Sequence, residues 1–212
     1  YYPDWIQNTQ KPYVQTRYIQ AFNLVQFCCN PNNPWDEKDI FLVFGTPKSK
    51  NDNWENGNEE KLKHELEKLK MENNSKVTIK FEEIQEDTST EAFWDIFSKI
   101  LGWINEKDEV FFDITHAYRY QPILSLIALK YAEHVKSITI KQMVYGGFEK
   151  LGSINEVKVK PIEERMAPVF DLTDFINILS WTDAAFSFIR YGKSDDLISM
   201  SENQVPLPDE IK

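Results

Sequence analysis

The sequence predicts an α/β fold in which a mainly parallel sheet is covered by helices on both faces. Two observations carry this prediction. Short apolar, β-rich runs alternate with amphipathic helical patterns over residues 13–145, and such alternation predicts right-handed βαβ crossovers. A hydrophobic fraction of 42% in 212 residues is enough for a packed core. We therefore expect one α/β unit, residues 1–165, followed by a segment 166–212 that leads toward a further domain.

The expected elements of the parallel part follow one another along the chain. Apolar positions recur every three or four residues in the helical segments, as at Leu62, Leu66 and Leu69. The strands are short runs rich in β-branched and aromatic residues. The predicted order is helix 13–29, strand 39–45, helix 58–72, strand 76–82, helix 90–104, strand 108–115, helix 121–135 and strand 137–145.

The pattern changes after the paired glycines at 146 and 147. Residues 156–160 alternate apolar and charged side chains, which predicts a short strand and a small β-hairpin extension, with its turn near residues 151–153. Residues 171–191 then have the pattern of a long helix that ends at Gly192.

Charge and composition limit the classes of partner. The formal net charge of −10 argues against duplex DNA or a long nucleic acid as partner, because such binding usually needs a basic face. No apolar run approaches the roughly 18 residues of a membrane span, and no secretory signal is recognisable. We expect a cytoplasmic protein in which Cys28 and Cys29 are reduced.

Residues 108–121 form the strongest candidate site. An apolar run ends at Asp113, and Thr115, His116 and Arg119 follow before Pro122 opens a helical pattern. A strand end beside a helix N-terminus is well placed to hold an anion, and Arg can bind phosphate in a bidentate fork. The alternative is structural: Asp113 caps a turn, the histidine is a satisfied hydrogen-bond partner, and the arginine pairs with an acidic neighbour.

Two further strand ends carry weaker candidates. Tyr145 could stack on a base, and Gly146 could allow close backbone approach to a ligand, although a tight turn needs the same glycines. Thr46 and Lys48 could contact phosphate, or could belong to a solvent loop. No dinucleotide-binding, phosphate-loop or paired-cysteine motif is present, so we expect no cofactor and no metal.

The amino-acid sequences of three segments resemble the DxTHG family of CRISPR-associated proteins. These segments are DITHAYR (residues 113–119), YGGFE (145–149) and FDLTDFINILSWTDAAFSFIRYG (170–192). In that family the first segment belongs to a CARF domain, a Rossmann-like sensor of cyclic oligoadenylate. The resemblance implies a ligand site made by the following residues: Thr46, Lys48, Thr115, His116, Ala117, Arg119, Gln121, Tyr145 and Gly146. Ala117 stands where the family often has Gly or Ser.

The resemblance also implies a role in type III CRISPR antiviral defence. A homodimer would form one symmetric cleft for cyclic tetra- or hexaadenylate and control an attached effector, most often a HEPN ribonuclease, whose motif this chain lacks. A first strand usually precedes a segment of this kind, so about one strand is expected to be missing. An alternative is a metal-independent ring nuclease in which His116 and Arg119 are catalytic. A transcriptional regulator would need a basic recognition helix, which the acidic remainder does not offer.

Overall fold

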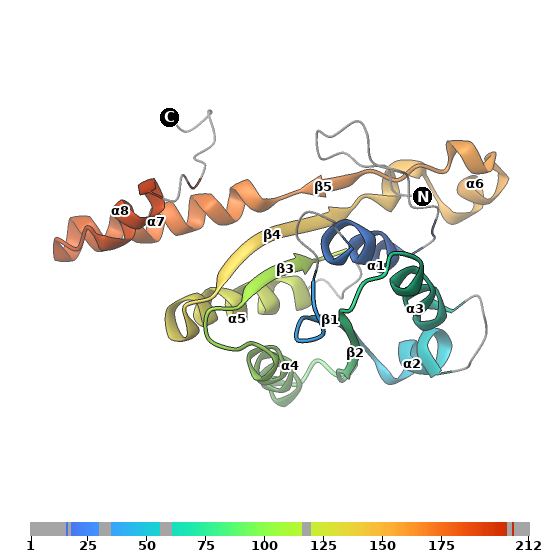
Figure 1. Ribbon diagram of the computed structural model, residues 1–212, viewed down its shortest axis with the longest axis horizontal. Coiled ribbons are helices and arrows are strands. Elements are labelled where there is room, and N and C mark those ends of the chain that lie inside the picture. The colour runs from blue at the N-terminus through green and yellow to red at the C-terminus, as the bar shows by residue number, and fades with distance from the viewer. Residues whose placement is uncertain are drawn as a thin grey trace.

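The computed structural model describes residues 16, 18–29, 35–55, 61–115, 120–202 and 205. Its strands form two sheets with helices on both sides (Figure 1). In the first sheet β1 and β2 are parallel; in the second, β4 lies between β3, which is parallel to it, and β5, which is antiparallel. The strands are β1 (Ile40–Gly45), β2 (Thr78–Glu83), β3 (Glu109–Asp113), β4 (Thr139–Gly146) and β5 (Val169–Asp171).

The helices match most of the expected segments. The main ones are α1 (Ile19–Asn23) with the π-helical turn η1 (Leu24–Cys28), α3 (Leu62–Glu72), α4 (Thr90–Trp103), α5 (Gln121–Lys136) and α7 (Thr173–Tyr191). Shorter helices are α2 (Pro47–Lys50), η2 (Asn51–Glu55), η3 (Phe148–Leu151), α6 (Ile154–Val159), η4 (Ile162–Glu164) and α8 (Asp195–Glu202). The α/β prediction and its parallel crossovers are therefore confirmed.

Neighbouring residues of β4 show how the two faces are covered. Met143 belongs to a core cluster with Ile96 and Ile100 of α4 and with residues of α5. Val144, the next residue, belongs to a cluster with Ile19 of α1. Successive side chains of a strand point to opposite faces, so α4 and α5 cover one face and α1 covers the other, as Figure 1 shows.

The predicted hairpin extension is wrong. Residues 156–160 do not form a strand; most of them belong to the helix α6. A capping box starts this helix: Ser153 Oγ accepts a hydrogen bond from the Glu156 N–H, and the Glu156 carboxylate accepts one from the Ser153 N–H. These bonds satisfy two backbone donors that a helix start leaves free. The antiparallel partner of β4 is instead β5.

The long C-terminal helix is confirmed, and it projects away from the sheets (Figure 1). Its end at Gly192 has a left-handed conformation, with φ of 68°. Only Ile176 and Ala184 of this helix are buried. The predicted boundary between residues 165 and 166 stays a prediction.

The cap of α6 should weaken in acid. Hydrogen bonds from Ser153 to the Glu156 carboxylate hold the pKa of that carboxyl below its usual range. A lowered pKa in the folded state means that the carboxylate's contribution is present at neutral pH and is lost as the pH falls through the folded value. We expect the protection factors of the α6 amides, measured by NMR hydrogen exchange and corrected for the intrinsic rate at each pH, to fall on acidification. Glu156→Gln should remove this fall, and identical pH profiles of the protection factors in both proteins would contradict the assignment.

Candidate ligand site at the carboxyl ends of the strands

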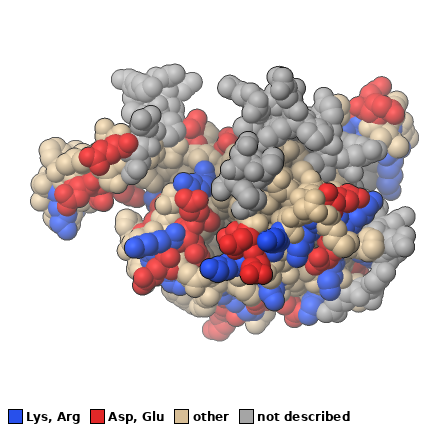
Figure 2. Space-filling model, in the orientation of Figure 1, with Lys and Arg blue, Asp and Glu red and all other residues tan. Residues whose placement is uncertain are grey.

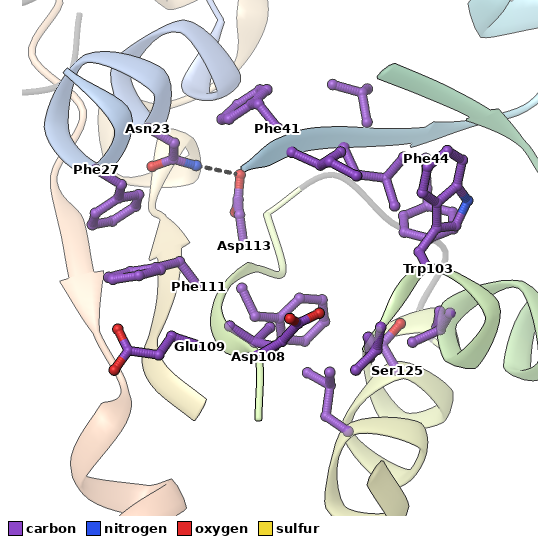
Figure 3. Close-up of a pocket in the computed structure, with 18 of the residues that line it drawn as sticks. Asn23, Phe27, Phe41, Phe44, Trp103, Asp108, Glu109, Phe111, Asp113 and Ser125 are labelled. Carbon is purple, nitrogen blue, oxygen red and sulfur yellow. Dashed lines mark hydrogen bonds between the residues drawn. The ribbon is translucent and has the colours of Figure 1, made fainter. Parts of the chain in front are cut away.

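The Asp113 carboxylate is the centre of the candidate site. Its Oδ1 accepts hydrogen bonds from the Thr115 N–H (2.8 Å) and the Thr115 hydroxyl (2.5 Å). Its Oδ2 accepts one from Asn23 Nδ2 at 2.8 Å, as Figure 3 shows. Asn23 belongs to α1 and is only 4% exposed. The Asp113 side chain therefore stabilises the turn that follows β3 and connects this strand to α1.

Thr115 links this turn to the neighbouring strand. Its hydroxyl oxygen accepts a hydrogen bond from the Gly146 N–H (2.7 Å), one step beyond the bond from the Ile114 N–H to the Val144 carbonyl (3.0 Å). Thus two residues predicted to share the site, Thr115 and Gly146, are in direct contact. The single hydroxyl proton of Thr115 is donated to Asp113, so toward a ligand the hydroxyl offers acceptor capacity only.

The same turn occurs a second time in the chain. At Asp171-Leu172-Thr173 the threonine N–H (2.9 Å) and hydroxyl (2.5 Å) donate to the Asp171 carboxylate. The Thr173 hydroxyl oxygen accepts a hydrogen bond from the Met143 N–H at 3.1 Å. Both strands that flank β4 therefore end in an Asp-x-Thr turn bonded to the β4 backbone. This supports the structural role for Asp113 and Thr115.

Those following residues, His116, Ala117 and Arg119, lie outside the described part of the chain. The structure fixes both neighbours of the segment. Thr115 precedes it at the strand end, and Gln121, 8% exposed, opens α5 after it. The segment therefore starts where β3 ends and finishes at a helix N-terminus, whose backbone N–H groups favour anions.

The other predicted residues are more dispersed. Thr46 caps α2, since its hydroxyl accepts a hydrogen bond from the Ser49 N–H at 3.2 Å. Lys48 is an exposed residue of that short helix. Neither residue lines the cavity described below. Their part in ligand binding stays a prediction.

Tyr145 and the glycines after it have a visible packing role. The Tyr145 ring stacks on Phe170 of β5, with 6.4 Å between centroids. A hydrogen bond to the Glu149 carboxylate raises the pKa of the Tyr145 phenol. A Cβ on Gly147 would lie 2.6 Å from the Phe170 ring, so this position requires glycine for close packing. Gly146 is the last residue of β4, and Gly147 has a φ of −83°, so neither glycine adopts a left-handed conformation. Ligand contact by Tyr145 and Gly146 stays a prediction.

A cavity of about 620 Å³ lies between the two sheets. We call it the inter-sheet cavity; its walls are residues 40–44 of β1 and residues 109–113 of β3. Phe27, Phe41, Phe44, Trp103 and Phe111 are among the aromatic side chains around it in Figure 3. The cavity reaches Asn23 and Asp113 at the carboxyl ends of the strands. Asn23 is the functional candidate that sequence reasoning missed, and its only signal was a polar residue within an apolar helical pattern.

The described residues contain no group of three or more His, Cys, Asp or Glu side chains arranged to hold a metal ion. Cys28 is buried, and burial raises the pKa of its thiol. It packs in an apolar cluster with Leu24 and Val43. This environment indicates a core residue, since a reactive cysteine needs a stabilised thiolate.

Crossovers between parallel strands, with polar groups gathered where strands end, are typical of a Rossmann-like domain. Residues 36–154, more than half of the chain, match the family model described as the CARF domain of the CRISPR system endoribonuclease Csx1. The chain belongs to this family of CARF domains of CRISPR-associated proteins.

A curated relative supports the same family. The chain is 27% identical over 121 residues to the CRISPR-associated protein MJ1674 of Methanocaldococcus jannaschii. This match covers 57% of the chain and 17% of the relative, so the chain corresponds to a small part of that protein. Among the described helices, none is long and apolar enough to cross a membrane.

Removal of the Asp113 carboxylate should destabilise the protein more than removal of its counterpart. Asp113→Ala takes the acceptor from buried Asn23 and from Thr115, and a buried polar group left unsatisfied costs about 1–3 kcal/mol. Asp171→Ala removes the acceptor of the Thr173 N–H and hydroxyl. These groups are exposed to water, so the loss of folding stability should be smaller. Urea unfolding of both variants measures the difference, and equal losses would show that the bond to Asn23 contributes little.

Proposed function

We propose that this chain is the sensor part of a type III CRISPR antiviral protein and binds a cyclic oligoadenylate as a homodimer. The observation that carries the proposal is the hydrogen-bonded turn of Asp113 and Thr115 at the end of β3, which comes immediately before residues 116–119 in the chain, with the start of α5 shortly after them. The family match, which spans this whole segment, supports it. Arg119 supplies a fork for phosphate, His116 a donor or acceptor, and the start of α5 a set of backbone donors.

The distribution of charge favours a compact ligand over a long nucleic acid. On the face shown in Figure 2, basic and acidic side chains are intermingled, without a broad basic surface. The chain as a whole carries a net charge of −10. A continuous nucleic acid needs many phosphate contacts along a basic path. A small cyclic oligonucleotide needs only a few, provided that they converge.

The dimer surface that we propose is an apolar stripe on α5. It consists of Ile123, Ile127, Tyr131 and Val135, spaced by four residues and each at least 50% exposed. Phe97 of α4 extends it, with its ring centroid 5.8 Å from that of Tyr131. An exposed apolar surface of this kind is typical of an interface.

The position of the α5 stripe favours a second copy of this chain as its partner. The stripe begins two residues after Gln121, at the end of the helix that adjoins the site. A two-fold axis there would bring two copies of residues 115–121 together. A cyclic oligoadenylate with an even number of units matches such symmetry.

The long helix α7 suits the connection to an effector. It extends beyond the sheets in Figure 1 and exposes apolar side chains on more than one side. These are Phe175, Leu179, Phe186, Phe188 and Ile189. The family description names an endoribonuclease. We propose that ligand binding changes the arrangement of the dimer and that α7 transmits this change to an attached ribonuclease.

Loss of Arg119 should severely weaken ligand binding. A charge-assisted phosphate contact contributes about 1.5–3 kcal/mol, so Arg119→Ala should lower the affinity at least about tenfold. Calorimetry with cyclic tetraadenylate and with cyclic hexaadenylate measures the affinity for each ligand and shows which ring size the protein prefers. Arg190→Ala is the matched control, because Arg190 is an exposed residue of α7.

The same samples separate a sensor from a ring nuclease. If the ligand is still intact after long incubation with stoichiometric protein, the protein is a sensor that does not cleave its ligand. If a 2′,3′-cyclic phosphate product forms in excess chelator, the protein is also a metal-independent ring nuclease. Unchanged affinity in a folded Arg119→Ala protein would remove Arg119 from the site.

A charge in the α5 stripe should separate the protomers. Ile127 is 53% exposed, so Ile127→Lys should leave the fold of one protomer intact and bury an unpaired charge in the dimer. We expect the mass from light scattering at high micromolar concentration to fall by half. Ile189→Lys, a matched change on α7, should leave the dimer intact. A wild-type protein that stays monomeric with and without ligand would contradict the dimer.

A further inference from the structure

A lysine of α5 links this helix to α7. The Nζ of Lys130 lies 3.4 Å from a carboxylate oxygen of Asp183 and 3.2 Å from Ser180 Oγ, and both partners belong to α7. The same Nζ lies 2.6 Å from the carboxylate of Glu133, about one turn further along α5. The side chain of Lys130 is 19% exposed, so salt and water screen these contacts only in part. We call the contacts of Lys130 with Ser180 and Asp183 the Lys130 bridge.

The Lys130 bridge lies where α7 changes from an attached to a projecting helix. The start of α7 is attached by Ile176, which belongs to the core cluster that includes Leu129 of α5. Ile176, Ser180 and Ala184 are spaced by four residues, so they lie on one face of the helix. In the part of α7 that follows Ala184, no described residue is buried. The bridge therefore holds α7 at the end of its attached part.

The partners of Lys130 allow the bridge to open at low cost. A charged group inside a protein is destabilising when it loses its partner. If α7 moves away, Lys130 keeps its shortest contact, which is the one to Glu133 of its own helix. The contacts that such a movement breaks are the longer ones on α7. The Asp183 side chain is 53% exposed and is therefore already close to water. Opening thus leaves no buried charge without a partner.

We propose that the Lys130 bridge is a releasable contact that holds α7 against α5 in the ligand-free protein, with Glu133 as the partner that retains the lysine when α7 moves. The helix that carries Lys130 begins at Gln121, beside the candidate site. A ligand that displaces α5 opens the bridge and releases the projecting part of α7. This regulatory role rests on the proposed function, whereas the bridge itself does not.

The two acidic partners should have opposite effects on α7 in the ligand-free protein. Asp183→Asn removes the charged partner on α7, so the protection factors of the amides of residues 185–188 should fall about two- to fivefold, as expected for a partly exposed ion pair. Glu133→Gln removes the competing partner on α5, so the bridge strengthens and the same protection factors should rise. NMR hydrogen exchange measures both changes, with the amide of buried Ile100 in α4 as the internal reference.

Two lysine variants complete this test. Lys130→Met should act like Asp183→Asn, because both remove the bridge. Lys68→Met is the matched control: Lys68 forms an exposed ion pair with Glu72 within α3, and its loss should leave the α7 amides unchanged. Changes of the same sign in Asp183→Asn and Glu133→Gln, or unchanged α7 protection in both, would overturn the proposal, because a fixed structural contact is weakened by the loss of either acid.

Ligand binding gives a second test with a defined sign. If the ligand opens the bridge, a protein without the bridge must bind the ligand more tightly, because coupling is reciprocal. Calorimetry with cyclic tetraadenylate and with cyclic hexaadenylate should therefore show an affinity about two- to fivefold higher for Lys130→Met, and a lower one for Glu133→Gln. A lower affinity of Lys130→Met would overturn the release. Absence of binding to the wild-type protein would refute the proposed function and the regulatory role together, while the exchange measurements still decide whether the bridge holds α7.

Discussion

The candidate site depends on the hydrogen bonds that the Asp113 carboxylate accepts. It receives the Thr115 turn with one oxygen and Asn23 of α1 with the other. Because Thr115 in turn holds the end of β4, this one side chain sets the relative positions of two strand ends and a helix. Bonds to an ionised acceptor are stronger than neutral ones. The segment that follows Thr115 therefore starts from a rigid anchor.

The sequence was most informative where structure is decided locally. The helix over 90–103 and the strands beside it follow from the period of apolar residues, which each element carries within itself. The error at α6 has a local cause as well. The alternation of Val157 and Val159 with lysines suggested a strand, whereas the capping box of Ser153 and Glu156 decides the structure. That box was visible in the sequence and was the better signal.

The site was predictable only in part. The contact of Thr115 with Gly146 follows from the rule that parallel strands end at one edge of a sheet. The bond between Asn23 and Asp113 joins residues 90 positions apart, and no local pattern indicates such a pair. The division into two sheets was equally hidden, because it depends on what lies between β1 and β3 and not on either strand.

The two Asp-x-Thr turns lie in different surroundings although they have the same hydrogen bonds. Their hydrogen bonds are the same, and both attach to the backbone of β4. The first ends a strand parallel to β4, and the chain then crosses over through α5, so polar residues and a helix N-terminus meet at the carboxyl edge of the sheet. The second ends an antiparallel strand, and Thr173 leads directly into α7, which leaves the sheet. The motif thus ends the strand in both places, while the direction of the strand determines at which edge of the sheet the turn lies.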